Sequence, residues 1–309
     1  MSRTAFVFPG QGAQAVGMGK DAYEASARTR EIFSQADETL DCKLSDIIMN
    51  GPDVLLKQTV NTQPALLTVS YALLELLQER GYKADYVAGH SLGEYSALVA
   101  AGVMSFTDAV RTVRARGSFM EQAVPGGRGA MAAVLGAERE ALAELCRTIS
   151  EEAGVVELAN VNCPGQIVIS GTAEGVAAAA ERGKEAGAKR VIPLDVSGPF
   201  HSSLMKPAAE RLGEVLRGVA MKDADIPVIA NVTALPVQEA AVIRELLEEQ
   251  VYSAVLWEDS VRWLANQGVD TFIEIGSGTV LAGLIKKVDK SLKVISVNSM
   301  ASIEALGSS

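Results

Sequence analysis

Histidine, cysteine and aromatic residues are all scarce in this sequence of 309 residues. It contains two histidines and three cysteines, and aromatic side chains make up 5% of the chain. Cys42, Cys146 and Cys163 are odd in number, far apart and in no CxxC spacing, so they support neither a disulfide framework nor a zinc site. We therefore expect a reducing, cytoplasmic environment.

Positive charge is also in short supply. Lys and Arg total 28 against 38 Asp and Glu, which gives a net charge of -10. Nucleic-acid-binding proteins normally carry a basic stripe, and membrane-surface proteins a basic patch, so neither class is expected. The richest apolar run, Pro64–Leu77, is interrupted by Ser70, Tyr71 and Glu75, which argues against a membrane span. The N-terminus lacks the apolar core and cleavage site of a signal peptide.

What is present is the composition of a globular enzyme, with 48% hydrophobic and 21% charged residues. Short β-type runs, such as Ala5–Phe8 and Tyr86–Ala88, alternate with longer helical patterns. The clearest helical patterns are Ala22–Leu40, Asn61–Arg80 and Phe106–Ala123. This alternation predicts an α/β fold with a mostly parallel sheet.

The pattern changes at Pro125–Gly129, where three glycines and a proline fall within five residues. The next segment predicts strands at 130–135, 155–162, 166–170 and 190–195, with helices at 138–153 and 173–186. This βαββαβ order is typical of a ferredoxin-like domain. We therefore predict a small domain at 127–197, inserted into a large domain formed by 1–126 and 198–309.

The sharpest local motif is Gly89–Gly93, a G-x-S-x-G sequence between a short apolar run and an Ala/Leu-rich helical pattern. Glycines on both sides of Ser91 allow a turn tight enough to expose its hydroxyl, and the following helix directs its N-terminus toward developing negative charge. Ser91 is therefore a candidate nucleophile. The alternative is a glycine-rich turn whose serine only caps the helix.

A serine nucleophile needs a base, and only two histidines can supply one. His90 adjoins Ser91, and neighbouring side chains in a turn usually diverge. His201 follows the glycine- and proline-rich loop where the inserted unit returns to the main sheet, so it becomes the candidate by elimination. A purely structural histidine is the alternative. The residues alone identify no Asp or Glu as a third member.

A second glycine-rich loop, Pro9–Ala15, follows the first predicted strand. It formally matches the dinucleotide pattern G-x-G-x-x-G/A. Pro9 and the charged helix that follows do not fit that context, because a dinucleotide site needs a second strand ending in an acidic residue. We predict instead that an N–H near Gln11 and the N–H of Leu92 stabilise an oxyanion. A plain strand-ending turn is the alternative.

Six segments together resemble the motifs of the malonyl-CoA:acyl carrier protein transacylase family of bacterial fatty acid synthesis. Their order and spacing match the family and they extend over nearly the whole chain. That family has a hydrolase-like large domain with a ferredoxin-like insertion, in agreement with the boundaries predicted above. The segments are Phe8–Gly12, Asn61–Ala65, Gly89–Glu94, Arg116–Gly117, Gly198–Ser202 and Glu274–Gly278.

The resemblance implies a role for each matching residue of the reaction centre. Ser91 matches the nucleophile that takes the malonyl group, and His201 matches the base. In this family a backbone carbonyl orients the histidine, and the matching residue is Gln250, which would explain why no third acid was found. Gln11 and Leu92 match the oxyanion N–H donors.

Arg116 matches the arginine that binds the free malonyl carboxylate. A guanidinium is suited to this role because it donates two parallel, charge-assisted hydrogen bonds to a carboxylate. Arg111, Arg114 and Arg116 share one predicted helix, and by sequence alone any of them could simply extend to solvent. Only the match to the Arg-Gly motif selects Arg116.

Three further residues match positions of the acyl pocket. Gln63 and Asn162 match residues that line it. Phe200 is the residue type that the family associates with malonyl rather than methylmalonyl, because a bulky ring would crowd an α-methyl group. The alternative for Phe200 is ordinary core packing.

The resemblance implies a ping-pong acyltransferase that moves malonyl from CoA to the phosphopantetheine thiol of acyl carrier protein, with no metal or redox cofactor. A serine esterase, a non-catalytic acyl-CoA or carrier-protein binding module, and a stand-alone acyltransferase of a polyketide assembly line are the alternatives.

Carrier proteins of this family are acidic, so a chain of net charge -10 needs a local basic patch to receive one. Lys286 and Lys287, which follow a predicted strand-end turn, are the first candidates for this docking site. A cluster on the inserted domain, Lys184, Lys189 and Arg190, is the second.

Overall fold

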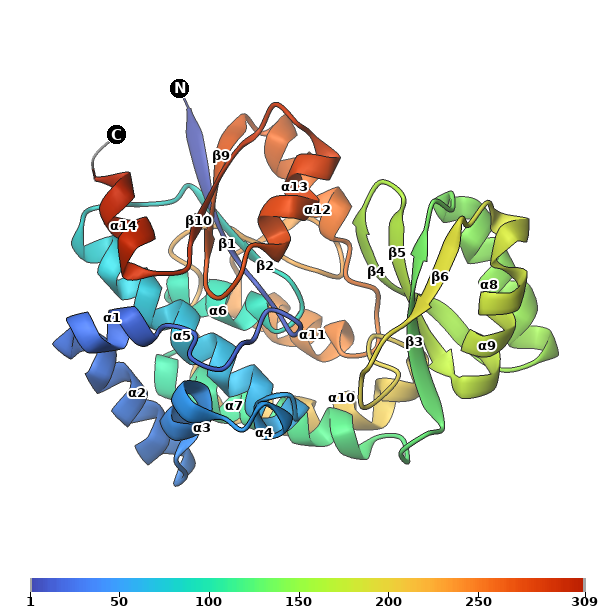
Figure 1. Ribbon diagram of the computed structural model, residues 1–309, viewed down its shortest axis with the longest axis horizontal. Helices are drawn as coiled ribbons and strands as arrows, with labels where there is room; N and C mark the ends of the chain where they lie inside the picture. The colour runs from blue at the N-terminus through green and yellow to red at the C-terminus, as the bar shows by residue number, and fades with distance from the viewer. Residues whose placement is uncertain (1, 308–309) are drawn as a thin grey trace.

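The computed structural model describes residues 2–307 and contains two lobes of unequal size (Figure 1). The larger lobe is built around a six-stranded sheet in which all neighbouring strands are parallel except the last pair, β7 and β8. In spatial order its strands are β10 (Lys293–Val297), β9 (Val269–Ile275), β1 (Arg3–Phe8), β2 (Tyr86–Gly89), β7 (Val228–Ile229) and β8 (Pro236–Val237). The predicted α/β class with a mostly parallel sheet is confirmed.

Helices cover both faces of this sheet, as the continuous apolar strands require. Alternate residues of β1 show the two faces. Phe6 and Phe8 join the larger buried cluster, and Ala5 and Val7 join the cluster around Trp257. The helices of this lobe are α1 (Lys20–Ala25), α2 (Ala27–Leu40), α3 (Leu44–Asn50), α4 (Asp53–Leu56), α5 (Thr59–Glu79), α6 (Gly93–Ala100), α7 (Phe106–Gln122), η2 (Ser203–Met205), α10 (Lys206–Arg217), α11 (Ala240–Gln250), α12 (Trp257–Asn266), α13 (Val280–Val288) and α14 (Met300–Leu306).

The single helix expected at Ala22–Leu40 is two helices, α1 and α2, separated at Ser26. Ser26 has extended backbone angles, and its hydroxyl accepts a hydrogen bond from the N–H of Thr29. It is therefore the N-cap of α2, and the serine that looked like an ordinary helix position ends one helix and starts the next.

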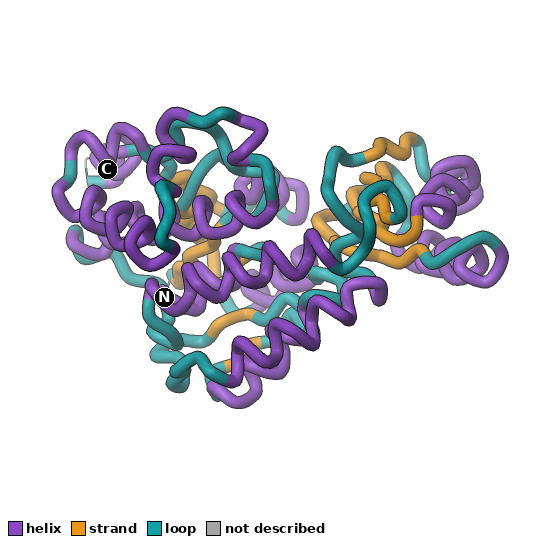
Figure 2. The backbone as a smooth tube through the Cα atoms, turned by 90° about the horizontal axis from the view of Figure 1, so that it is seen from below, coloured by secondary structure: helices purple, strands orange, loops and turns teal. Residues whose placement is uncertain are grey.

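The smaller lobe contains an antiparallel sheet of β4 (Val156–Cys163), β5 (Gln166–Thr172), β3 (Gly129–Leu135) and β6 (Arg190–Pro193), in that spatial order. Its helices, α8 (Arg139–Glu152), α9 (Ala173–Arg182) and η1 (Gly183–Ala186), follow the order predicted from the sequence. Figure 2 shows them on the outer side of this sheet, away from the larger lobe. The strand order is that of a ferredoxin-like fold.

A short β-bridge joins the two lobes. The N–H of Val161 on β4 donates to the carbonyl of Val255, 2.9 Å away, and the N–H of Val255 donates to the carbonyl of Ala159 at 2.8 Å. An ion pair between Arg139 and Asp259, at 2.8 Å, crosses the same boundary. The edge strand of the smaller sheet is therefore fixed to the loop that precedes α12.

Two further observations bear on the surroundings of the protein. All three cysteines carry free thiols. None of the helices within residues 2–307 combines the length and the apolar character needed to cross a membrane.

Candidate active site

Ser91 lies in a sharp turn between β2 and α6, with a left-handed backbone (φ 52°). The flanking glycines are required by close backbone contacts. A Cβ at Gly89 would lie 1.9 Å from the backbone of Gly93, and one at Gly93 would lie 2.1 Å from the carbonyl oxygen of Phe8. No side chain fits either space, which is why the chain can turn tightly enough to expose the serine.

The Ser91 hydroxyl contacts His201. Its Oγ lies 2.7 Å from His201 Nε2, and His201 Nδ1 lies 2.8 Å from the backbone carbonyl oxygen of Gln250. Because a carbonyl only accepts hydrogen bonds, Nδ1 carries the proton and the lone pair of Nε2 faces the serine. His201 also has a left-handed backbone (φ 56°), a strained conformation that often marks functional residues.

His201 is buried, and this controls its charge. Burial, with a smaller contribution from the Arg116 guanidinium, lowers the pKa of His201 to about 3. The imidazole is therefore neutral at pH 7 and can accept a proton from Ser91. The other histidine has a different partner, since His90 Nε2 lies 2.8 Å from Asn162 Oδ1.

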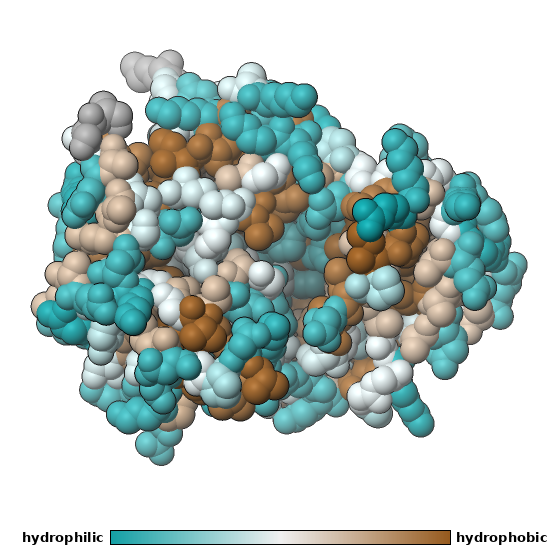
Figure 3. Space-filling model, in the orientation of Figure 1, coloured by the Kyte–Doolittle hydropathy of each residue, from teal (hydrophilic) through white to brown (hydrophobic). Residues whose placement is uncertain are grey.

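A pocket of about 120 Å³ opens onto this pair, at the boundary between the lobes. In Figure 3 the surface is hollowed between the larger and the smaller lobe. Part of the lining is apolar, and we call these residues the apolar wall: Met120, Met131, Leu194, Val196 and Phe200. The rest of the lining consists of Leu92 and the polar residues Gln11, His90, Ser91, Arg116, Asn160 and His201.

Arg116 is a buried cation whose hydrogen-bond partners are all neutral. Its guanidinium donates to Gln63 Oε1 at 2.9 Å, to Gln250 Oε1 at 2.9 Å and to Ser91 Oγ at 3.2 Å. Within residues 2–307 no carboxylate forms an ion pair with it, and its Nε has no partner. Glu94 acts on it only as a more distant charge, beyond ion-pair distance. A buried cation without a directly paired carboxylate is costly, so the arrangement favours an anionic ligand beside Ser91.

The N-terminal loop comes close to the serine turn. A Cβ at Gly10 would lie 2.3 Å from the carbonyl oxygen of His90 and 3.7 Å from the nitrogen of Leu92. Ser277, after β9, donates to the carbonyl of Ala13 at 2.7 Å and holds this loop in place. Gln11 and Leu92 both border the pocket, and in the described part of the chain neither N–H has a hydrogen-bond partner.

Two residues expected to line the pocket lie elsewhere. Gln63 contacts Arg116 from behind, through its Oε1, rather than bordering the pocket. Asn162 holds His90, and the asparagine that borders the pocket is Asn160, two residues earlier on β4. The pairing register of β4 shifts on either side of Asn160, which the sequence pattern does not reveal. Phe200 does border the pocket.

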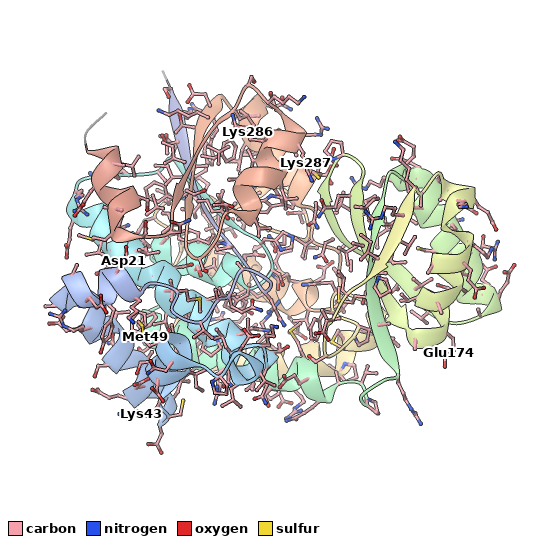
Figure 4. The ribbon with its side chains drawn as sticks, in the orientation of Figure 1. Asp21, Lys43, Met49, Glu174, Lys286 and Lys287 are labelled. Carbon is pink, nitrogen blue, oxygen red and sulfur yellow. The ribbon has the colours of Figure 1, made fainter. Side chains whose placement is uncertain are left out.

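Lys286 and Lys287 lie in the last turn of α13, the helix that follows the loop at the carboxyl end of β9 (Figure 4). The helix runs back from that loop, so the lysines lie about one helix length from it. Lys286 Nζ donates to the carbonyls of Lys290 and Leu292, and Lys287 Nζ lies 3.4 Å from Gln166 Oε1 on the smaller lobe.

Sequence reasoning missed two buried polar residues beneath the serine. Asn231 follows β7, and its amide contacts the backbone on both sides of His90. Glu94, in the first turn of α6, accepts a hydrogen bond from Gln250 Nε2 at 2.9 Å, and burial raises its pKa to about 7. Asn231 has a signal that could have found it, because polar residues after parallel strands commonly border an active site.

Together these groups make an acyl-transfer or acyl-hydrolysis centre. The structure brings together an exposed serine, a neutral histidine, two free N–H groups and a buried cation. Within residues 2–307 no cluster of three or more His, Cys, Asp or Glu side chains could hold a metal ion.

Comparison with known proteins identifies the same class. The chain matches the acyl transferase domain family over residues 5–308. It is 59% identical over 304 residues to a malonyl CoA-acyl carrier protein transacylase of Bacillus subtilis, covering 98% of this chain and 96% of that protein.

Two solved structures are also closely similar. An acyl carrier protein S-malonyltransferase from Vibrio cholerae aligns with a TM-score of 0.96 and 45% identity over 99% of this chain and 100% of that one. A malonyl-transacylase in complex with a type II PKS acyl-carrier protein aligns with a TM-score of 0.96 and 43% identity over all of both chains. The chain therefore belongs to the acyl transferase domain family, alongside the malonyl CoA-acyl carrier protein transacylases.

Proposed function

We propose that the chain transfers a malonyl group from malonyl-CoA to the phosphopantetheine thiol of acyl carrier protein, through a malonyl ester on Ser91. The observation that carries the proposal is the buried Arg116 guanidinium, which lacks a carboxylate partner and lies 3.2 Å from the serine hydroxyl. A malonyl group is a short acyl chain ending in a carboxylate, so it matches both the small pocket and the unpaired cation.

In the first half-reaction, Ser91 Oγ attacks the thioester carbonyl while His201 Nε2 takes the hydroxyl proton. The N–H groups of Gln11 and Leu92 stabilise the oxyanion. The thiolate of CoA then leaves with the proton from His201. The carbonyl of Gln250 holds the imidazole in the required tautomer throughout.

The second half-reaction reverses these steps with a different thiol. The carrier-protein thiol gives its proton to His201 and attacks the malonyl-serine ester. The oxyanion collapses, and Ser91 leaves with the proton. This cycle uses side chains and backbone N–H groups for every step, so we propose that it needs no metal or redox cofactor.

The product supplies fatty acid elongation in this proposal. Free thiols at all three cysteines favour a reducing compartment, and we propose the cytoplasm as the site of action. A polyketide assembly line is the second candidate, favoured by the similarity to a malonyl-transacylase in complex with a type II PKS acyl-carrier protein. Loading assays with carrier proteins of each class separate the two.

The decisive experiment is to incubate the enzyme with malonyl-CoA alone and locate the acyl group by peptide mass spectrometry. We expect one malonyl group on the peptide that contains Ser91, and none after Ser91→Ala. Ser96→Ala is the matched control, because Ser96 is a buried serine on the next turn of α6 and does not border the pocket. Label on a cysteine, or label that survives Ser91→Ala, contradicts the proposal.

Transfer must also be distinguished from hydrolysis, because a serine esterase would use the same residues. We expect the malonyl-enzyme to persist until carrier protein is added. The malonyl group should then remain on the carrier thiol as a thioester. Rapid release of free malonate without carrier protein would identify an esterase. A binding module without catalysis would carry no covalent label.

A further inference from the structure

Asn231 is a fully buried amide directly beneath the serine turn, 1% exposed. It lies two residues after β7, at the carboxyl end of the sheet, and no step of the mechanism above uses it. A buried primary amide must satisfy a carbonyl oxygen and two N–H groups, so its contacts show what it is there to hold.

The amide of Asn231 contacts both sides of the turn. Its Oδ1 accepts the N–H of Ser91 at 2.8 Å, and its Nδ2 donates to the carbonyl of Gly89 at 2.7 Å. Only one orientation of the amide satisfies both groups, because a backbone N–H cannot accept and a backbone carbonyl cannot donate. Asn231 therefore sets the plane of the peptide that enters Ser91.

The peptide that leaves Ser91 is held by a second amide in contact with the first. Gln250 Nε2 donates to the carbonyl of Ser91 at 2.9 Å and lies 3.2 Å from Asn231 Oδ1. In a trans peptide the C=O and N–H groups point in opposite directions. Drawing the Ser91 carbonyl toward Gln250 thus directs the N–H of Leu92 the other way, toward the pocket that Leu92 borders.

Glu94 anchors both amides from below. Its Oε2 accepts Gln250 Nε2 at 2.9 Å and the backbone N–H of Asn231 at 3.3 Å. The whole group is buried, so a broken hydrogen bond here would not be replaced by water. Such a network can hold the left-handed backbone of Ser91, which is unfavourable for any residue but glycine.

We propose that Asn231 is a positioning residue for the acylation step: its amide, with that of Gln250, holds both peptides flanking Ser91 so that the hydroxyl meets His201 and the Leu92 N–H faces the pocket. This inference rests on the proposed function, because it takes Ser91 as the nucleophile. It assigns Asn231 an effect on the rate of chemistry rather than on substrate binding.

The test uses Asn231→Ala and the isosteric Asn231→Asp in the full-length enzyme. Asp keeps the side-chain shape and the oxygen that accepts the Ser91 N–H. When ionised, however, it places a second oxygen, which cannot donate, next to the Gly89 carbonyl. For each variant the single-turnover rate of Ser91 acylation is measured against malonyl-CoA concentration. We expect the maximal rate to fall about tenfold to a hundredfold, as for small misplacements of reacting groups, and the half-saturating concentration to change far less.

Asn61→Ala is the matched control for a purely structural loss. Asn61 is also a buried asparagine, and its amide donates to the carbonyl of Leu55 and accepts from Arg114, away from the serine turn. We expect this variant to lower the melting temperature while Ser91 acylates at the wild-type rate.

Two results would overturn the inference. One is a wild-type acylation rate in Asn231→Ala or, if that variant fails to fold, in Asn231→Asp at a pH at which its carboxyl is ionised. The other is a result in which both Asn231 variants lose no more acylation rate than Asn61→Ala does, when the variants have lost the same amount of melting temperature. A wild-type enzyme that takes no label on Ser91 would instead overturn the proposed function, and this inference with it.

Discussion

The two sides of the pocket differ in kind. Beneath Ser91 lies what we call the polar floor, in which every side chain is hydrogen-bonded to another residue of the group: Glu94, Arg116, His201, Asn231 and Gln250. The apolar wall lines the pocket and includes Met131 from the smaller lobe and Phe200 from the larger. One side offers directed donors and acceptors, and the other offers shape alone.

This difference separates two tasks that a transferase must perform. The polar floor fixes charges and atoms in place, which speeds chemistry on the right group. The apolar wall limits the size of the acyl group and removes water, which strengthens the electrostatic interactions of the floor. Substitutions in the polar floor should therefore lower the rate of chemistry, whereas substitutions in the apolar wall should change which acyl groups are accepted.

The largest expected effect comes from removing the cation of the polar floor. Arg116→Ala should lower kcat/KM for malonyl transfer by about a hundredfold or more, since stripping one partner from a buried charge pair costs about 3–5 kcal/mol. Acetyl transfer should lose far less, because acetyl has no carboxylate to leave unpaired. The measurement is the ratio of the two rates with each CoA ester.

Arg114→Ala is the control for this ratio, because Arg114 is on the same helix but binds the carbonyl of Val60, outside the pocket. Arg116→Lys should restore malonyl transfer only in part, since an ammonium lacks the planar fork of a guanidinium. Equal losses for malonyl and acetyl in Arg116→Ala would mean that Arg116 supports the fold rather than the substrate.

The next effect tests the apolar wall. Phe200→Ala should raise methylmalonyl transfer relative to malonyl transfer by about tenfold, because one extra methyl group in an apolar pocket changes discrimination by about 1–3 kcal/mol. Competition between the two CoA esters measures the ratio. Phe119→Ala is the control, since the Phe119 ring packs on Arg211 and does not border the pocket. An unchanged ratio would assign Phe200 to core packing.

Sequence reasoning reached the reacting groups and not the network that holds them. Ser91 and its two glycines form a local strand-turn-helix motif, and His201 and Gln250 followed from scarcity and resemblance. Asn231 is separated from Ser91 by 140 positions, and no local pattern connects them. Contacts at such separation arise only when the sheet brings β2 and β7 side by side.

Other details that the sequence did not determine have similarly physical causes. Asn160 and Asn162 lie on one strand, and it is Asn160 that borders the pocket, beside shifts in the pairing register. Lys286 and Lys287 follow the turn after β9 in the sequence, and α13 carries them away from it; their role in docking stays a prediction. The ferredoxin-like lobe was predictable because its βαββαβ order of elements along the chain is typical of that fold.

A smaller effect concerns the pH dependence of the reaction, which involves both the polar floor and the apolar wall. The lowered pKa of His201, about 3, means that the base stays neutral at mildly acidic pH. We therefore expect protonation of His201 to cause no fall in kcat/KM for malonyl-CoA between pH 8 and pH 6. Glu94, with a pKa of about 7, does titrate in this range, so the profile is measured in Glu94→Gln as well as in the wild type. An ordinary imidazole, with a pKa near 6.5, would lose about three quarters of its neutral form over this range.

If burial keeps the histidine neutral, opening the apolar wall should weaken that effect. Phe200→Ala should admit water, raise the pKa of His201 and give the profile an acidic limb, while Phe119→Ala should leave it flat. A profile that falls by half near pH 6.5 in both the wild type and Glu94→Gln would contradict the desolvation argument.

The smallest expected effect concerns surface residues that would bind the carrier protein, outside both the polar floor and the apolar wall. Reversing Lys286 and Lys287 to Glu should raise KM for carrier protein severalfold at low salt, and added salt should reduce the difference. Malonyl loading from CoA should change little. Lys184→Glu with Lys189→Glu tests the alternative cluster, and an effect only there would move the docking site to the smaller lobe.

The β-bridge between Val161 and Val255 has a consequence for how substrates are chosen. An opening of the lobes that separated β4 from the loop before α12 would break its two backbone hydrogen bonds, each worth about 1 kcal/mol net, and the Arg139–Asp259 ion pair beside them. A cost of a few kcal/mol makes the bridged form the major state and leaves an opened form as a minor population of roughly 0.1–10%. Most encounters with an acyl group are therefore encounters with the bridged form.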